Sequence, residues 1–132
     1  MKKLLVLLFT VSTLVACERS YILPIPSKTE EREISFSRDV QPLFDIDCAG
    51  CHNNVAMYPN LAAGNSYNAL TTTLPNCGGS YIDTINPSLS LIYTILLPSP
   101  ACVSGQMPPS NPWPPTKIQM VLDWINQGAL NN

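Results

Sequence analysis

Two of the five cysteines and the only histidine of this 132-residue chain lie together, in the segment Cys48-Ala49-Gly50-Cys51-His52. In a helical turn, side chains three and four residues apart lie on the same side, so the two sulfurs and the imidazole face one way. Sulfurs at this spacing can form thioether bonds to a porphyrin while the imidazole reaches its iron, and Cys-x-x-Cys-His is the pattern of covalent haem attachment. The segment therefore predicts one haem c, held by Cys48 and Cys51, with His52 as the proximal iron ligand.

Two other uses of this segment stay open from the residues alone. A thioredoxin-like module for disulfide exchange would use Cys48 and Cys51 as a dithiol, but it is expected in a βαβ context, and no alternating strand pattern is visible. A structural zinc site needs four ligands in paired spacing, and the remaining candidates, Cys77 and Cys102, lie too far apart in the sequence to form such a pair. Haem attachment is the interpretation that these residues favour.

A second axial ligand has to come from elsewhere in the chain, and a methionine is the natural candidate. Met57 lies only five residues after His52, which leaves little chain to pass round a porphyrin. Met120 lies off the apolar stripe of its predicted helix. Met107 lies 55 residues after His52, and Pro108 favours an extended backbone before it. We therefore expect Met107 to be the distal iron ligand, and the alternative is a methionine that only fills apolar space.

The segment before Cys48 has the apolar period of a helix. The apolar side chains that recur on one face are Phe36, Val40, Leu43 and Phe44. Ser37 or Asp39 can cap the start of this helix. A start at Asp39 places Pro42 in the first turn, where its missing N–H costs little. We expect a short helix that runs directly into Cys48.

The C-terminal segment, residues 115–129, predicts a longer helix with a clear apolar stripe. That stripe consists of Ile118, Val121, Leu122 and Ile125. Thr116 and Gln119 have the spacing of a capping box, Pro114 and Pro115 mark the stop before the helix, and Gly128 is placed to end it.

Two shorter helices are expected between these ends, over residues 65–74 and 86–97, the second with Pro87 just inside its start. Five prolines between residues 108 and 115 predict an extended, stiff loop. No segment alternates in the manner of a strand. The chain therefore predicts a small all-α domain with long Pro-rich loops.

The N-terminus has the features of an export signal. Residues 1–16 begin with Lys2 and Lys3 and continue with an apolar run that is too short to span a bilayer. The closing sequence Leu-Val-Ala-Cys resembles the lipobox of bacterial lipoproteins, in which cleavage precedes the cysteine and lipid is attached to it. That resemblance implies lipidation of Cys17; the alternative is an ordinary signal peptide with an incidental cysteine.

Three regions follow from this interpretation: a cleaved signal peptide at 1–16, a lipidated tether at 17–33 and a folded domain at 34–132. Acyl chains on Cys17 would hold the protein on a bacterial membrane, facing the periplasm or the cell exterior. In an oxidising compartment, the two remaining cysteines, Cys77 and Cys102, are expected to form a disulfide, rather than stay as free buried thiols. Closing a loop of about 26 residues would stabilise the fold by roughly 3–4 kcal/mol.

The charge of the mature chain limits its partners. Removal of residues 1–16 takes two of the seven basic residues and none of the nine acidic ones, which leaves a formal charge of −4. No patch rich in Lys or Arg remains, so a nucleic-acid partner is not expected. An acidic surface instead suits a basic patch on a partner protein.

Taken together, the short helix ending in the Cys-x-x-Cys-His segment, the later Met107-Pro108-Pro109 and the C-terminal helix resemble a class I cytochrome c. More narrowly, the segments 39–52, 86–93, 107–109 and 118–129 resemble the small planctomycete-type cytochrome c domain. The resemblance covers roughly residues 34–129 and implies a monohaem, all-α fold in which the N- and C-terminal helices cross and enclose the haem. It implies thioethers at Cys48 and Cys51, with His52 and Met107 as the axial ligands. The pair Cys77 and Cys102 lies outside the family's basic pattern.

The expected function is single-electron transfer between redox proteins at the membrane, by cycling of the haem iron between Fe(II) and Fe(III), without enzymatic activity. A dry wall around the haem is expected from Phe36, Leu43, Phe44, Leu122 and Ile125. Trp113 either covers an edge of the haem or serves in ordinary packing. The alternative function is a pentacoordinate haem protein that senses a diatomic gas or reduces peroxide; it requires that Met107 is not bound to iron.

Overall fold

The computed structural model describes residues 32–53, 57–100 and 102–132. These belong to one compact unit, Arg32–Asn132. The expected signal peptide, the lipidation site Cys17 and most of the tether lie outside the described residues and stay predictions. Within the described part of the chain, no helix is long and apolar enough to cross a membrane.

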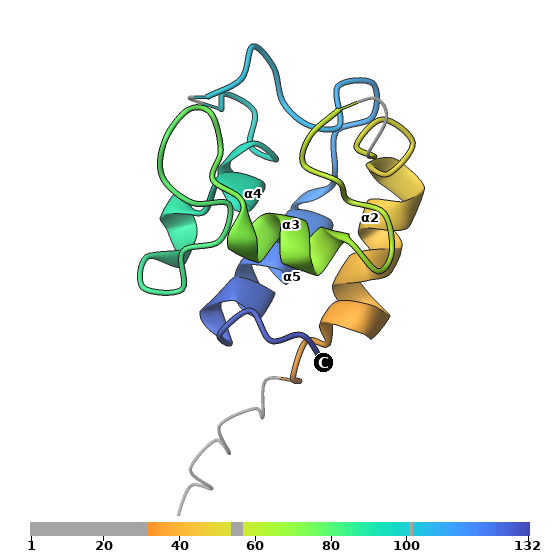
Figure 1. Ribbon diagram of the computed structural model, residues 1–132, viewed down its shortest axis with the longest axis vertical. Helices are drawn as coiled ribbons and strands as arrows, with labels where there is room; N and C mark the ends of the chain where they lie inside the picture. Colours follow the sequence, from red (N-terminus) through yellow and green to blue (C-terminus); the bar gives the residue numbers. More distant parts are fainter. Residues whose placement is uncertain (1–31, 54–56, 101) are drawn as a thin grey trace, which may run out of the picture. The chain divides into compact units, whose positions relative to one another are not determined.

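The described residues form helices and irregular segments, with no strand among them, so the predicted all-α class is confirmed (Figure 1). In chain order the elements are the π-helical turn η2 (Phe36–Val40), α2 (Gln41–Asp47), α3 (Ser66–Thr72), the 3-10 turn η3 (Pro87–Leu89), α4 (Leu91–Thr94) and α5 (Pro115–Asn126). Residues 102–114 contain neither helix nor strand.

The predicted helix before the Cys-x-x-Cys-His segment is present and ends where it was expected to end. Pro42 lies in the first turn of α2, and Cys48 is the residue that caps its C-terminus. The cap at the start differs from the prediction, because the hydroxyl of Ser35 accepts a hydrogen bond from the Arg38 amide (3.3 Å) at the N-cap of η2. Asp39 completes this cap from within the turn, since its carboxylate accepts from the Ser35 amide (2.8 Å).

The predicted C-terminal helix is also present, as α5, and Gly128 follows it at φ +98° in the conformation that glycine favours. The predicted capping box does not form: Pro114 is the N-cap, without a side-chain hydrogen bond. The buried face consists of Ile118, Val121, Trp124 and Ile125. Trp124 is fully buried and was missing from the predicted stripe, whereas Leu122 is only half-buried.

The helix predicted at 65–74 is confirmed by α3, but the one predicted at 86–97 is interrupted. It divides into η3 and α4 at Ser90, whose backbone leaves the helical region. The buried hydroxyl of Ser90 accepts from the Asp83 amide (2.8 Å), and the Leu91 amide donates to the carbonyl of Ser80 (3.0 Å). The segment therefore bonds to the chain that precedes it instead of continuing one helix.

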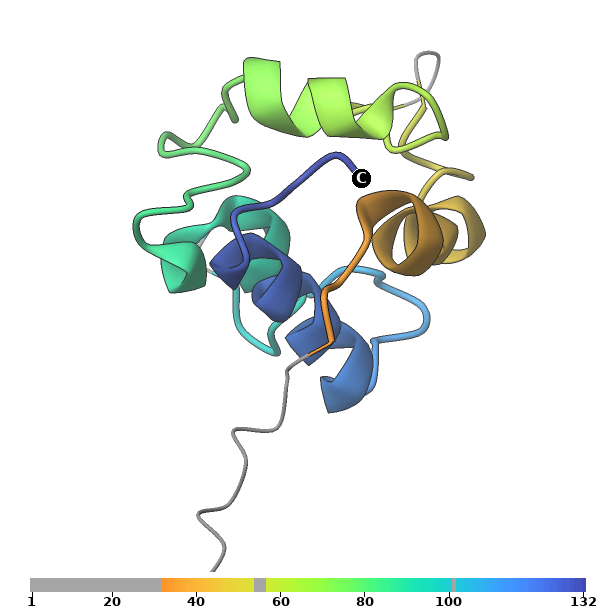
Figure 2. The same cartoon turned by 90° about the horizontal axis from the view of Figure 1, so that it is seen from below.

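The core joins the two ends of the folded unit. The ring of Phe36 lies 5.1 Å from that of Trp124 and 5.3 Å from that of Tyr67, measured between centroids. The C-terminal segment runs beside α3 and the start of η2 (Figure 2), where the Ser37 amide donates to the carbonyl of Asn132 (3.0 Å). Aromatic packing thus fixes the base from which α2 extends toward the Cys-x-x-Cys-His segment.

Candidate functional site

The Cys-x-x-Cys-His segment continues the helical path of α2 for one more turn. The Cys48 amide donates to the carbonyl of Phe44 (2.9 Å), and the His52 amide donates to the carbonyl of Cys48 (2.8 Å). The Cys51 amide also donates to the carbonyl of Cys48 (3.1 Å). These bonds form the turn that was expected to bring two sulfurs and an imidazole to one side.

The imidazole of His52 is unusually placed for a structural histidine. The backbone carbonyl of His52 accepts a hydrogen bond from the Leu61 amide (2.8 Å), which fixes the chain after the turn. Its ring atom Nδ1 is buried and has no hydrogen-bond partner within the described part of the chain. A buried polar atom without a hydrogen-bond partner costs free energy. Such an atom therefore indicates that the imidazole contacts a bound group, such as a ligand or a metal ion.

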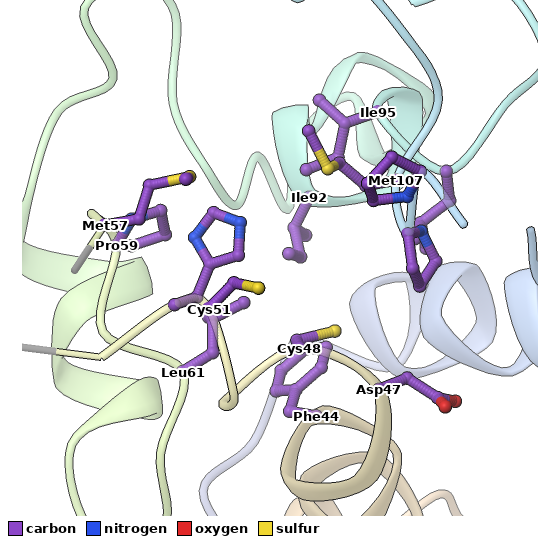
Figure 3. A pocket seen from close by; sticks show the side chains of 14 residues that line it. Phe44, Asp47, Cys48, Cys51, Met57, Pro59, Leu61, Ile92, Ile95 and Met107 are labelled. Atoms are coloured by element: carbon purple, nitrogen blue, oxygen red, sulfur yellow. The ribbon is translucent and has the colours of Figure 1, made fainter. Parts of the chain in front are cut away.

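Four residues predicted from the sequence, Cys48, Cys51, His52 and Met107, line a single apolar cavity of about 140 Å³. A second hollow of about 430 Å³ adjoins this cavity, and the two share His52, Pro59, Ile95 and Met107. Figure 3 shows the thiols of Cys48 and Cys51 along one edge of the space, with Met107 and Ile95 along another. The fold therefore brings Met107 to the Cys-x-x-Cys-His segment across a long stretch of chain.

Met107 is held in place by the end of α4. Its amide donates to the carbonyl of Ile95 (2.8 Å), the residue that caps this helix. The neighbouring side chain of Gln106 donates to the carbonyl of Leu96. Earlier in the same loop, Cys102 is joined to Cys77 by a disulfide with Cα atoms 5.9 Å apart, at the wall of the second hollow.

A second methionine also reaches the cavity. Met57 lines it with half of its side chain exposed (51%), and Figure 3 shows it beside Pro59, across the space from Met107. Met120 is half-buried on α5 and is not among the lining residues. Met57 and Met107 are thus both within reach of the site, whereas chain length alone had set Met57 aside.

The wall of the cavity differs from the predicted one. Of the five expected wall residues only Phe44 lines it, while Phe36 and Ile125 belong to the core at the other end of α2 and α5. The apolar side chains that sequence reasoning missed are Pro59, Leu61, Ile92, Ile95, Leu96, Pro108 and Pro109. The apolar run over residues 91–97 was the available signal, since a short helix so rich in apolar side chains must cover something.

Trp113 does not line the cavity and serves in packing. It is buried, and its indole N–H donates to the Asp47 carboxylate (2.8 Å). The Lys117 ammonium binds the same carboxylate oxygen (2.8 Å) and lies 5.4 Å from the centre of the Trp113 ring. Hydrogen bonds from Lys117 and then Trp113 hold the pKa of Asp47 below its ordinary value, against the opposing effect of burial. This cluster anchors the start of α5 to the end of α2.

The thiol of Cys48 has the wrong environment for disulfide exchange. Burial, with a smaller contribution from the Asp47 charge, raises the pKa of Cys48 to about 12. The residue also follows the C-terminus of α2, where the helix dipole opposes a negative charge. Reactive cysteines need a lowered pKa, as at a helix N-terminus. The dithiol interpretation is therefore disfavoured.

A structural zinc site would also lack two of its four ligands. Cys77 and Cys102 are bonded to each other and cannot join Cys48 and Cys51 in a tetrahedral site. Among the residues whose placement is described, no three His, Cys, Asp or Glu side chains come together as a possible metal site.

The residues present fit a covalent haem. Two thiols and an imidazole project from one turn, the surrounding wall is apolar, and a thioether reaches the same space from a distant loop. A porphyrin is larger than the enclosed cavity, so it would also extend into the adjoining hollow. No protein-family model, no curated protein and no solved structure matches the chain.

Proposed function

We propose that the protein is an exported monohaem c-type cytochrome that carries single electrons between redox proteins. The observation that carries this proposal is the shared cavity: Cys48, Cys51, His52 and Met107 all line it, although Met107 lies 55 residues after His52 in the sequence. The resemblance to cytochromes c supports the same assignment. The lipobox-like sequence before Cys17 supports attachment to a bacterial membrane, where such carriers meet their partners.

In this proposal Cys48 and Cys51 form the thioether bonds, His52 is the proximal iron ligand and Met107 is the distal one. The haem, when bound, supplies one-electron chemistry through Fe(II) and Fe(III). Side chains such as Phe44, which line the cavity, would exclude water from the macrocycle. Apolar surroundings would disfavour the additional charge of the oxidised state and so raise the potential.

The tether of Met107 to α4 favours electron transfer over a pentacoordinate haem. Because the hydrogen bond to Ile95 already fixes the Met107 backbone, binding of its thioether to iron costs little further ordering. An iron with two permanent ligands changes little on oxidation and has no open position for a gas or a peroxide.

The ligand assignment is tested by three methionine variants of the protein made in a host with haem-attachment machinery. We expect Met107→Ala to lose the far-red absorption band of the iron–methionine bond. Met57→Ala and Met120→Ala are the controls and should keep it, although Met57 lines the same cavity. Loss of the band in Met57→Ala instead would reverse the assignment. A wild-type protein without the band, which binds carbon monoxide readily, would favour the pentacoordinate alternative.

A further inference from the structure

Charged residues are almost absent from the part of the sequence that builds the site. Between Asp47 and Lys117 the chain contains no Lys, Arg or Glu, and Asp83 is its only Asp. Charged residues normally make up about a quarter of a globular chain. The long segment that supplies both cysteines, the histidine and both methionines of the site is thus nearly uncharged.

The few charges that the described residues carry are paired or lie elsewhere. All three of their Lys and Arg side chains bind carboxylates: Arg32 and Arg38 pair with Asp39 (2.9 and 3.0 Å), and Lys117 pairs with Asp47 (2.8 Å). Asp47 is the only Asp, Glu, Lys or Arg among the side chains that line the cavity or the adjoining hollow. Figure 3 shows its carboxylate directed away from the two thiols.

The side chains that line the cavity and the adjoining hollow nevertheless include several exposed ones, and none of these is charged. We call the exposed residues that line the cavity and the adjoining hollow the uncharged rim: Cys51, Met57, Tyr58, Asn76, Cys77 and Pro109. Met57 is 51% exposed and Tyr58 is 63% exposed, which is high for large apolar side chains. Exposed apolar side chains gathered at the mouth of a site are typical of a surface that contacts another molecule.

We infer that the uncharged rim is the docking surface for a redox protein whose own cofactor edge is covered by uncharged, largely apolar side chains. This inference rests on the proposed function, because the rim surrounds the proposed haem. It replaces the expectation of a basic partner: a charged partner patch would lose its hydration against this rim and find no opposite charge in return. Association then depends on apolar burial, without long-range steering.

The charge preference is tested by stopped-flow electron transfer between the haem-loaded protein and two redox proteins. One is a cupredoxin with an uncharged apolar patch over its copper, and the other is a cytochrome c with lysines around its haem edge. We expect the cupredoxin to react faster, and the rate constants of both pairs to change less than about twofold between roughly 10 mM and 500 mM salt. A lysine-ringed cytochrome that reacts faster at low salt and slows more than about tenfold with added salt overturns the inference.

The position of the surface is tested by placing one charge on the rim. Tyr58→Glu should slow the reaction with the cupredoxin by about fivefold or more, because an unpaired carboxylate would be buried in the complex. Ile85→Glu is the matched control: Ile85 is 88% exposed and lines neither the cavity nor the hollow, so its rate should be unchanged. Equal rates in the two variants contradict the inference.

Two further readouts separate the possible failures. The potential of each variant is measured, and the rates are compared at equal driving force; a protein without any haem spectrum would refute the proposed function itself. Sedimentation of the wild type should show a monomer. A concentration-dependent dimer that Tyr58→Glu abolishes would assign the rim to a second copy of this chain and overturn the redox-partner assignment.

Discussion

At the scale of single residues, Asp47 links the site to the rest of the fold. It is the last residue of α2 and lines the cavity, yet its carboxylate binds Trp113 and Lys117, at the approach to α5 and within that helix. The sequence alone allows Trp113 either to cover an edge of the haem or to serve in ordinary packing. Its indole N–H instead donates a hydrogen bond to the Asp47 carboxylate, at the end of the helix that Cys48 caps. Trp113 therefore helps to position the site without lining it.

Replacement of this carboxylate should destabilise the protein in a pH-dependent manner. The pKa of Asp47 is lowered in the fold, so its pairing stabilises the protein above the unfolded pKa of about 4, and this contribution is lost as the pH falls through the folded pKa. We expect Asp47→Asn to lower the free energy of unfolding by about 1 kcal/mol at pH 7, measured by urea denaturation.

The difference in the free energy of unfolding between Asp47→Asn and the wild type should become smaller toward pH 2. Asp123→Asn is the control, because the Asp123 carboxylate lies on α5 and accepts a hydrogen bond from neutral Gln119 (2.8 Å). A difference for Asp47→Asn that stays constant from pH 7 to pH 2 would show that the ion pair is not its cause.

At the scale of elements, the loop that carries Met107 is fixed at two points. The Ile95 carbonyl holds the Met107 backbone, and the disulfide between Cys77 and Cys102 closes the chain over a separation of 25 residues. The two restraints act on different states. The hydrogen bond orders the loop in the folded protein, whereas a disulfide mainly reduces the freedom of the unfolded chain.

Removal of the disulfide should therefore lower stability more than it disturbs the proposed iron site. We expect the double variant Cys77→Ser, Cys102→Ser to lose about 2–4 kcal/mol in the free energy of unfolding, measured by urea denaturation. The iron–methionine band should persist, because the bond from the Met107 amide to the Ile95 carbonyl remains. A variant of unchanged stability that loses the band would instead make the disulfide a positioning element for Met107.

Helices with a clear apolar period could be predicted from the sequence. Helix boundaries that depend on hydrogen bonds to other segments of the chain could not. The helices around Pro42 and before Gly128 follow from local rules. The break at Ser90 depends on hydrogen bonds to Ser80 and Asp83, which local sequence does not reveal. For the same reason the residues of the Cys-x-x-Cys-His segment could be named from the sequence. The apolar run over residues 91–97 indicates a buried face, but local sequence does not show that this face lines the cavity.

At the level of the whole folded unit, one core cluster connects the aromatic residues of the terminal elements to the cavity. Aromatic rings of Phe36, Tyr67 and Trp124 join the N- and C-terminal elements at one end. The cavity opens beyond α2, between its terminal turn, α4 and the Met107 loop. The cavity shares its wall with this core, because Phe44, Leu61, Ile92 and Leu96 belong to the core cluster and also line the cavity.

The central claim, one haem bound covalently through Cys48 and Cys51, is tested most directly by intact mass spectrometry of the matured, exported protein. We expect a mass that exceeds that of the processed polypeptide by one haem, and this added mass should remain after extraction with acidified acetone. Cys48→Ser with Cys51→Ser should lose this addition, whereas Cys77→Ser with Cys102→Ser should keep it. A wild-type chain without the added mass, isolated from a host that attaches haem to other proteins, would contradict the account.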